Sequence, residues 1–332
     1  MKRALITGVC GQDGRYLTEF LLAKQYRVFG LARRAPIEGS VLGQNFCLLY
    51  GDMRDDLSIR TAISKSWPDE IYNLAGQTFV PTSWEAPAET VDVNTSGLLR
   101  ILKIVAEVKP DTRVYQASSS EMFGNHEGSC SDETPMWPTS PYGVSKFAAH
   151  RLCDLYRQRG LYVVSGILFN HESPRRGHEM VTRKIATQVA AWATGKTGIL
   201  KLGRLDSRRD WGYSKEYVEA MWMMLQQDFA MDYVCGTGES HSVSEFLYEA
   251  AAVAGVEKDY VSDNLEIDDR LTRRNEIYNM SANNDKIRKV LNWEPKVRFK
   301  ELVSLMVDAE LYSAGMLELR GPDGELKVMV MR

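Results

Sequence analysis

Two side chains suited to proton transfer, Tyr142 and Lys146, lie four residues apart in the sequence. On a helix this spacing places both on one face, where the ammonium group of Lys146 would lower the tyrosine pKa and favour the phenolate. Such a phenolate can take a proton from a hydroxyl group, which Ser119 is placed to hold. A Tyr-x-x-x-Lys match is expected by chance about once in a chain with this many tyrosines. This one, however, follows a serine-rich strand end at a suitable distance.

Glu121 lies two residues after Ser119 and offers a second base. If a carbon that carries a hydroxyl is oxidised to a ketone, the C–H bond on the adjacent carbon becomes acidic. A carboxylate can then remove that proton and pass it to a hydroxyl leaving from the next carbon. Glu121 therefore indicates an elimination of water and not a simple oxidation. The alternative is that Glu121 is an acid at the start of a helix or on the surface.

Composition excludes several classes of function. The chain has 332 residues, 44% of them hydrophobic, which is enough for one large core or two merged domains. A formal charge of -3 gives no electrostatic reason to expect a nucleic-acid or membrane partner. No apolar run reaches membrane-spanning length, and no signal peptide is visible. The five cysteines are scattered and the five histidines lack metal-ligand spacing, so we expect a reduced cytoplasmic protein without a metal.

The order of elements predicts an α/β fold of the Rossmann-like, doubly wound type, with a smaller interleaved α/β substrate domain. We expect the dinucleotide-binding domain to comprise residues 1–168 and about 209–234, the substrate domain residues 169–208 and 235–313, and a tail residues 314–332. The predicted strands are 4–7, 27–31, 46–50, 70–74, 113–117 and 163–168. The predicted helices are 14–24, 57–64, 93–108, 142–158, 181–194, 215–227, 243–254, 285–291 and 299–312.

A glycine-rich turn, Gly8-x-x-Gly11-x-x-Gly14, links the first predicted strand to the first predicted helix. Glycines at this place let backbone amides approach a pyrophosphate, and the helix N-terminus favours the negative charge. The second strand ends at Arg33 and Arg34, where an NAD site usually has an acid, so a 2′-phosphate and NADP are favoured. The alternatives are an ordinary turn and a solvated basic pair. The residues expected to line this site are Gly8, Gly11, Gln12, Asp13, Gly14, Arg33, Arg34, Asp52, Met53, Leu74, Ala75 and Gln77.

Longer segments resemble the GDP-mannose 4,6-dehydratases, a group within the extended short-chain dehydrogenase/reductase superfamily. The resemblance covers nearly the whole chain up to Ser313. It is strongest in residues 7–14, 115–121, 166–177, 181–184, 208–212 and 217–222. It implies an NADP-dependent enzyme that converts GDP-mannose to GDP-4-keto-6-deoxymannose.

The resemblance also assigns roles to individual residues. Ser119 takes the place of a threonine that binds the sugar 4-hydroxyl, Tyr142 is the base at C4, and Glu121 is the base at C5 and the acid at C6. Lys146 and Tyr142 also belong to the cofactor site. The further residues implied for NADP are His171 and Arg176, and those implied for the nucleotide-sugar are Asn170, Lys184, Arg209, Arg273 and Glu276.

Two departures from the family pattern leave alternatives open. The segment 35–45 is shorter than the corresponding segment of the family, which helps to assemble a tetramer. The protein is therefore expected to be either a homodimer or a homotetramer. Arg273-Arg274-Asn275-Glu276 replaces a family Arg-Pro-x-Glu, so a different GDP-sugar, such as a heptose, is an alternative substrate. A nucleotide-sugar 4-epimerase would need no base at C5, and a cofactor-sensing regulator would not need the Tyr142–Lys146 pair.

Overall fold

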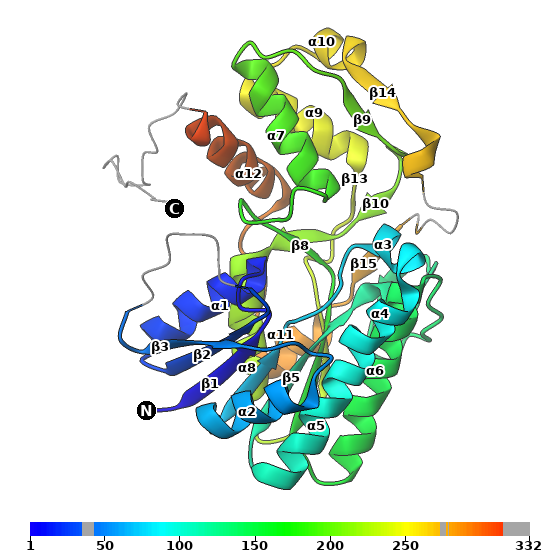
Figure 1. The fold of residues 1–332 in the computed structure, drawn as a ribbon. Helices are drawn as coiled ribbons and strands as arrows, with labels where there is room; N and C mark the ends of the chain where they lie inside the picture. Colours follow the sequence, from blue (N-terminus) through cyan, green and yellow to red (C-terminus); the bar gives the residue numbers. More distant parts are fainter. Residues whose placement is uncertain (35–42, 273–276, 278, 315–332) are drawn as a thin grey trace.

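A seven-stranded parallel sheet forms the centre of the protein (Figure 1). The structure is a computed structural model and describes residues 1–34, 43–272, 277 and 279–314. Its strand order, β12-β7-β5-β4-β1-β2-β3, places the topological switch point between β1 and β4. All seven strands run parallel, an arrangement that requires crossover connections between them. The strands are β1 Arg3–Thr7, β2 Arg27–Ala32, β3 Phe46–Tyr50, β4 Glu70–Asn73, β5 Arg113–Ser119, β7 Val163–Leu168 and β12 Asp232–Cys235.

Helices cover both faces of this sheet (Figure 1). On one face, Leu17 and Leu21 of the first helix share a core cluster with Tyr217 and Met221. On the other face, Ile59, Leu98 and Cys153 belong to a second cluster. The helices on the first face are α1 Gln12–Ala23, α8 Ser214–Leu225 and α11 Asp285–Leu291. Those on the second are α2 Asp56–Ser66, α5 Gly97–Val108 and α6 Pro141–Gln158.

Short elements connect the ends of β4 and β5 to the helices. A π-helical turn, η1, leads directly into α5, and a 3₁₀ turn, η2, follows β5. Both lie close to the start of α6. These elements are α3 Val80–Glu85, α4 Pro87–Val91, η1 Asp92–Ser96 and η2 Ser120–Phe123.

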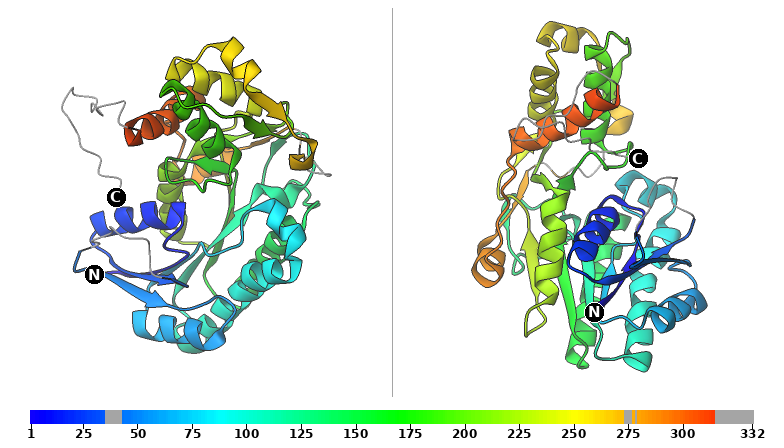
Figure 2. Two further views of the ribbon diagram at one scale, coloured as in Figure 1. Left: turned by 45° about the horizontal axis from the view of Figure 1, so that its top comes forward. Right: turned by 90° about the vertical axis from the view of Figure 1, so that its left-hand side faces the viewer.

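A second core lies outside the sheet layers. Three helices pack together to form this core, and its buried side chains include Trp192, Trp211 and Phe246. Figure 2 shows this part standing over one end of the sheet in both views. Its elements are α7 Val181–Ala193, β9 Leu200–Leu202, α9 Val243–Ala254, α10 Lys258–Asp263, β14 Leu265–Ile267, η3 Asp269–Leu271 and α12 Phe299–Ser313.

Among the residues that the structure describes, four pairs of short strands lie outside the main sheet, and three of them are parallel. Because their partners are far apart in the sequence, they join segments that leave the sheet at different points. Besides β9 with β14, the pairs are β10 Arg208–Arg209 with β13 His241–Ser242, β11 Trp211–Tyr213 with β8 Asn170–Glu172, and β15 Met280–Ala282 with β6 Gly128–Cys130.

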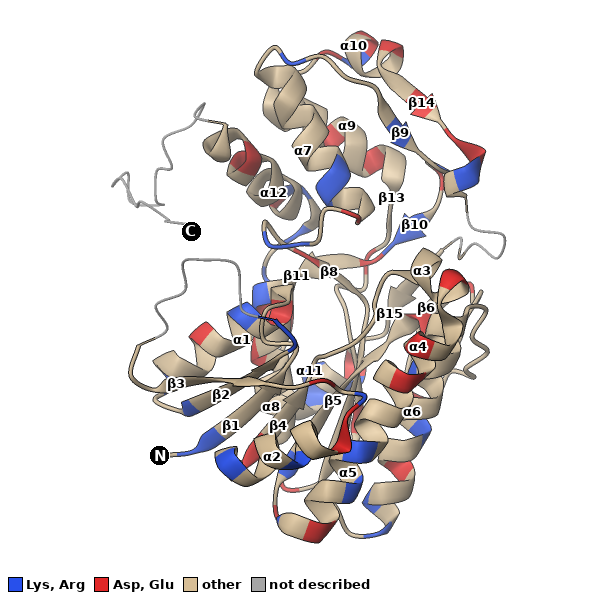
Figure 3. Ribbon diagram, in the orientation of Figure 1, with Lys and Arg blue, Asp and Glu red and all other residues tan. Residues whose placement is uncertain are grey.

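The fold class predicted from the sequence is confirmed, and all six predicted strands are present within one or two residues. The seventh strand, β12, was not predicted, and the short strands expected among the helices of the second half were not assigned to residues. Arg273, Glu276, most of the segment 35–45 and nearly all of the tail lie outside the described residues. Charges of both signs are interspersed over the drawn elements (Figure 3). Within the described ranges, no helix combines the length and apolar composition needed to cross a bilayer.

Candidate active site

The glycine turn between β1 and α1 leaves no room for side chains. Gly8 has a φ of +68°, and a Cβ there would lie 2.8 Å from the backbone nitrogen of Ala75. A Cβ on Gly14 would lie 2.4 Å from the carbonyl oxygen of Gly8. The turn thus packs closely against the loop after β4, and α1 begins within it, at Gln12, with Gly11 as its N-cap. Its first backbone amides are therefore available to an anion such as a pyrophosphate.

Thr7 fixes the loop after β4 beside this turn. Its hydroxyl accepts hydrogen bonds from the backbone amides of Leu74 (3.1 Å) and Ala75 (3.0 Å), and donates one to Asn73 Oδ1 (2.7 Å). In the same loop, Gln77 Oε1 is buried and has no hydrogen-bond partner among the described residues. The tight glycine cradle and this unsatisfied oxygen are features that a bound dinucleotide would fit.

A hydrogen-bonded network lies under the glycine turn. Asp13 Oδ2 is 2.9 Å from His171 Nε2, and Asp13 Oδ1 accepts a hydrogen bond from Ser214 (2.6 Å). The other ring nitrogen of His171 is 2.8 Å from the carbonyl oxygen of Phe169. Because both partners are acceptors, this arrangement favours an imidazolium ring that donates from both nitrogens. His171 also stacks on Tyr217, with the ring centroids 4.7 Å apart.

This geometry shifts the pKa values of both groups. Burial alone would raise the pKa of Asp13, but the charge and hydrogen bond of His171 lower it to about 2. Burial alone would lower the pKa of His171, but the charge of Asp13 raises it. Since both ring nitrogens already have protein partners, we expect His171 to act mainly by orienting Asp13. Its contact with a cofactor stays a prediction.

The pair predicts a pH-dependent stability. Because folding raises the pKa of His171, the pair contributes its full stabilisation of the fold below pH 6.5, the ordinary pKa of histidine. That stabilisation is lost as the pH rises through the pKa that His171 has in the folded protein. We expect His171→Gln to lower the melting temperature by about 2–6 °C in mildly acidic buffer, and much less in alkaline buffer. Melting curves over a pH series, with the exposed His178→Gln as control, measure this. A difference that does not change with pH would contradict the imidazolium assignment.

The start of α6 holds Tyr142 and Lys146. Ser140 caps the helix by accepting a hydrogen bond from the Gly143 amide (3.0 Å), and Pro141 occupies the first turn. Lys146 is buried, its Nζ donates to the carbonyl oxygen of Ala117 (2.9 Å), and it lies 5.8 Å from the Tyr142 ring centroid. Burial lowers the pKa of Lys146 to about 8, although Asp13 opposes this. The predicted pair therefore shares one face, as the spacing indicated.

Ser119 and Glu121 follow the end of β5. Ser119 caps η2 by accepting a hydrogen bond from the Glu121 amide (3.2 Å), and Glu121 is half-buried. The first turn of α6 packs directly on this segment: a Cβ on Gly143 would lie 2.8 Å from the carbonyl oxygen of Glu121. Hence a glycine next to Tyr142 allows the backbone of Glu121 to approach α6 closely. Sequence reasoning missed Gly143.

We expect Gly143→Ala to push η2 away from α6. A methyl group at 2.8 Å from a backbone oxygen forces a shift, and small displacements of reacting groups carry large rate penalties. The turnover rate should fall about tenfold or more, while the melting temperature changes little because alanine favours the helix. Steady-state kinetics beside Val144→Ala, an exposed neighbour on the same helix, test this. Unchanged turnover would contradict the packing argument.

Asn94 is a second residue that the sequence analysis missed. Its Oδ1 accepts from the Gln77 amide (2.9 Å), and its Nδ2 donates to the Gln77 carbonyl oxygen (3.0 Å) and to Ser145 Oγ (3.0 Å). Ser145 in turn donates to the carbonyl oxygen of Tyr142 (2.7 Å). Asn94 thus joins the loop after β4 to the helix that carries Tyr142 and Lys146. The π-helical turn η1, which carries it, has no signal in the sequence, although such turns are frequent at functional sites.

The residues predicted for the adenosine end of the cofactor lie after β2 and β3. Arg33 and Arg34 are exposed, and Arg33 is 4.0 Å from Glu89. Asp52 pairs with Arg54 at 2.7 Å, and hydrogen bonds from Arg54 lower the pKa of that carboxyl group. Next to it, Met53 is buried, so it contributes packing more than a polar contact.

The residues predicted for the sugar nucleotide lie on several elements. Asn170 is half-buried on β8, and Arg209 on β10 donates to the carbonyl oxygens of Arg208 and Ile277. Lys184 is exposed on α7, while Arg176 forms an ion pair with Glu172 at 3.0 Å. The structure brings Ser119, Glu121, Tyr142 and Lys146 to one end of β5 and α6.

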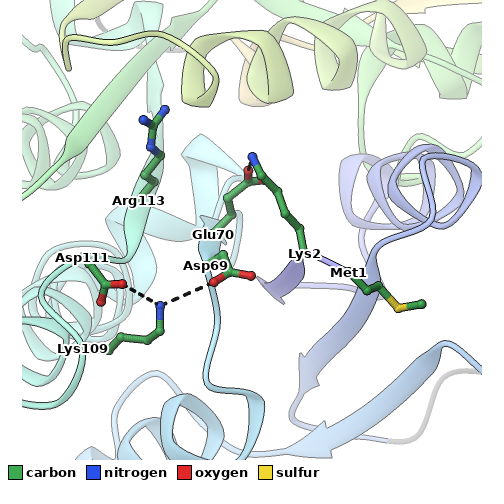
Figure 4. Close-up of a pocket in the computed structure, with 7 residues that line it drawn as sticks. All are labelled: Met1, Lys2, Asp69, Glu70, Lys109, Asp111 and Arg113. Carbon is green, nitrogen blue, oxygen red and sulfur yellow. Dashed lines mark hydrogen bonds and ion pairs between the residues drawn. The ribbon is translucent and has the colours of Figure 1, made fainter.

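A cavity of about 380 Å³ lies at the opposite, amino-terminal edge of the sheet (Figure 4). Acids and bases line it in equal number, and they neutralise one another. Lys2 pairs with Glu70 at 2.9 Å, and Lys109 lies 3.5 Å from Asp69 and 3.2 Å from Asp111. Because the predicted catalytic side chains come from the carboxyl ends of the strands, this cavity is separate from them. Among the described residues, no group of three or more potential ligands is placed to hold a metal ion.

Solved structures of enzymes that act on nucleotide-sugars share the fold of this chain. A Thermus thermophilus UDP-glucose 4-epimerase in complex with NAD matches with a TM-score of 0.83 and 26% identity, over 93% of this chain and 98% of that one. DesIV from Streptomyces venezuelae, a dTDP-glucose 4,6-dehydratase, also has a TM-score of 0.83, at 22% identity over 95% of this chain and 99% of that one. The latter likeness shows the fold alone.

Sequence comparison is more specific. The model of the GDP-mannose 4,6-dehydratase family matches residues 5–306. GDP-mannose 4,6 dehydratase 1 of Arabidopsis thaliana is 45% identical, over 93% of this chain and 90% of that protein. The GDP-mannose 4,6-dehydratase of Yersinia enterocolitica is 39% identical, over 95% of each. The chain belongs to the GDP-mannose 4,6-dehydratase family, as the resemblance predicted.

Proposed function

We propose that this protein is an NADP-dependent lyase that converts GDP-mannose to GDP-4-keto-6-deoxymannose. Its membership of the family and 45% identity to the Arabidopsis dehydratase support this reaction. The structural observation that carries the proposal is the packing of Gly143 on the backbone of Glu121. This contact brings the backbone of Glu121 against the first turn of the helix that carries Tyr142 and Lys146. We propose that the Glu121 carboxylate serves there as the second base, which an elimination requires and an epimerisation does not.

The chain's own residues support a nicotinamide dinucleotide as cofactor, as does the NAD complex of the Thermus epimerase. The glycine cradle and the start of α1 would hold the pyrophosphate, with Gln12 fixed by Ser173 (2.7 Å) and by the carbonyl oxygen of His171 (3.0 Å). Arg33 and Arg34 would hold the 2′-phosphate of NADP. A nicotinamide bound there would supply reversible hydride transfer, for the oxidation at C4 of the sugar and the reduction at C6.

Proton transfers belong to the side chains of this chain. Tyr142 takes the proton of the C4 hydroxyl as that carbon becomes a ketone, and the buried ammonium group of Lys146 stabilises the phenolate. Ser119 holds the same oxygen. Glu121 then removes the proton at C5, made acidic by the neighbouring ketone, and gives it to the hydroxyl that leaves C6 as water. As C6 is reduced, C5 takes up a proton from solvent through Glu121, and Tyr142 releases to solvent the proton that it took from the C4 hydroxyl. The net change is the loss of one water molecule.

Recognition of the sugar nucleotide rests on a separate set of groups. A diphosphate needs cationic partners, and arginine offers bidentate contacts to it. We propose that Arg209, with Lys184, holds the diphosphate and that Asn170 contacts the sugar. Arg273 and Glu276, which lie outside the described residues, complete the proposed set.

A panel of nucleotide-sugars tests this function directly. Purified protein with NADP and GDP-mannose should yield a product lighter by one water, without accumulation of NADPH. A product of unchanged mass would identify a 4-epimerase, and stoichiometric NADPH would identify a simple dehydrogenase. If the protein turns over a GDP-heptose in preference to GDP-mannose, the proposed type of reaction stands and the proposed substrate is wrong.

If the site prefers NADP to NAD, Arg33→Ala should weaken the binding of NADP much more than the binding of NAD. We expect the Kd of NADP to rise about tenfold or more, because a charge-assisted bond to the 2′-phosphate is lost. The Kd of NAD should change little, since NAD lacks that group. Calorimetric titration of both cofactors measures this, with the exposed Arg60→Ala as control. An equal loss for both would contradict a 2′-phosphate site at Arg33.

We propose two further features of organisation. One is a dinucleotide domain of residues 1–168 with about 209–234 and a substrate domain of residues 169–208 with 235–313. The two separate cores support a division into two domains, but Trp211 packs in the second core and α11 packs on the sheet, so the cores depart from these bounds at both places. The assembly is proposed as a homodimer or a homotetramer. Light scattering of the purified protein distinguishes these two, and a monomer at micromolar concentration would contradict both.

A further inference from the structure

Asp210 is a fully buried carboxylate that the proposed reaction does not use. Its Oδ1 accepts hydrogen bonds from the amide (2.8 Å) and the hydroxyl (2.7 Å) of Thr237. Its Oδ2 accepts from the amides of Gly238 (2.9 Å) and Ala282 (3.0 Å). Every partner is a donor, so the site is built for a carboxylate with two fully occupied oxygens.

These bonds join three segments that are far apart in the sequence. Asp210 itself lies between β10 and β11, Thr237 and Gly238 lie in the loop from β12 to β13, and Ala282 ends β15. The packing around the carboxylate is tight, because a Cβ on Gly236 would lie 2.8 Å from Oδ2. Asn284 adds a second link through the amide (3.1 Å) and the carbonyl oxygen (2.7 Å) of Gly236.

The joined segments carry groups assigned above to the sugar nucleotide. Arg209 immediately precedes Asp210, and its guanidinium group donates to the carbonyl oxygen of Ile277, three residues before β15. Trp211 immediately follows, and it pairs with Asn170 across the parallel strands β11 and β8. A shift of Asp210 would therefore move Arg209 and Asn170 together.

We propose that Asp210 is a positioning residue for nucleotide-sugar binding, which it supports by holding β10, the loop after β12 and β15 in one arrangement. This inference rests on the proposed function. Asp210 acts through Arg209 and Asn170 and does not touch the reacting atoms. Its loss should weaken substrate binding and leave the cofactor site and the chemistry of bound sugar intact.

Asp210→Asn is a sharp test, because it keeps the volume and removes one acceptor. In either orientation of the amide, an NH₂ group faces at least one backbone N–H, that of Thr237 or those of Gly238 and Ala282. We expect the KM of the nucleotide-sugar and the Kd of GDP to rise about tenfold or more. The turnover rate at saturation and the Kd of NADP should change less than threefold.

Two variants complete the experiment. Asp206→Asn removes an exposed acid shortly before β10 and should leave all these constants unchanged. Gly236→Ala would place a methyl group 2.8 Å from Oδ2 of the same carboxylate, and close to the side chain of Ala282, and should raise the KM in the same way. Melting temperatures and NADP titration establish that each variant is folded.

The outcomes separate this inference from the proposed function. Asp210→Asn protein with unchanged KM and unchanged GDP affinity would overturn the positioning role. An equal loss of NADP affinity and turnover would overturn it as well, since that pattern reports a general structural defect. If the unmodified protein binds no GDP and turns over no GDP-sugar, the proposed function fails instead.

Discussion

Glu121→Gln should stop the reaction halfway. The amide cannot remove the C5 proton, so the rate of water loss should fall by about 10²–10⁴-fold, the usual contribution of a general base. Tyr142, Lys146 and Ser119 remain in place, so oxidation at C4 should still proceed. Enzyme mixed with GDP-mannose and NADP should therefore show NADPH absorbance that persists, together with a 4-keto sugar that has kept its C6 hydroxyl.

A matched control is Glu127→Gln, which changes an exposed carboxylate a few residues further along the chain. Its activity should equal that of the unmodified protein. Full dehydratase activity in Glu121→Gln would remove Glu121 from the role proposed here. Loss of the NADPH signal as well would place Glu121 in binding or in the first step and not in the elimination.

Tyr142→Phe should abolish both half-reactions. Without the phenol no group is placed to take the C4 proton, so hydride transfer itself should slow by about 10²–10⁴-fold. No transient NADPH should appear, which distinguishes this variant from Glu121→Gln. Stopped-flow absorbance under single-turnover conditions measures the difference.

Tyr156→Phe is the natural control, because it removes a phenolic hydroxyl from the same helix at a partly exposed position. Its kinetics should be unchanged. An NADPH transient of normal size in Tyr142→Phe would show that another group takes the C4 proton. Ser119 would then be the first candidate.

The sheet and its helices could be predicted because local pattern and global fold agree there. Buried runs such as that of β7, between helices that begin at clear caps such as Ser140 with Pro141, define parallel strands and crossovers. The Tyr142–Lys146 pair follows from helical spacing alone. The glycine turn could be placed because it lies between a predicted strand and a predicted helix.

The features of the site that could not be predicted depend on contacts between segments that are far apart in the sequence. The role of Gly143 arises only from its approach to Glu121, and that of Asp210 from amides 27 and 72 residues away. Asn94 lies in a π-helical turn, which no periodicity marks. The strand pair β8–β11 is three residues long, too short for its pattern to be distinguished from a loop.

The most direct test of the account follows a single hydrogen atom. GDP-mannose carrying deuterium at C4 should give a 4-keto-6-deoxy product with that deuterium at C6, because the same cofactor accepts and returns the hydride at one site. In heavy water, C5 should gain solvent deuterium, since Glu121 exchanges its proton. Deuterium that stays at C4 of an isomerised sugar, or collects in free NADPH, would contradict the proposed elimination.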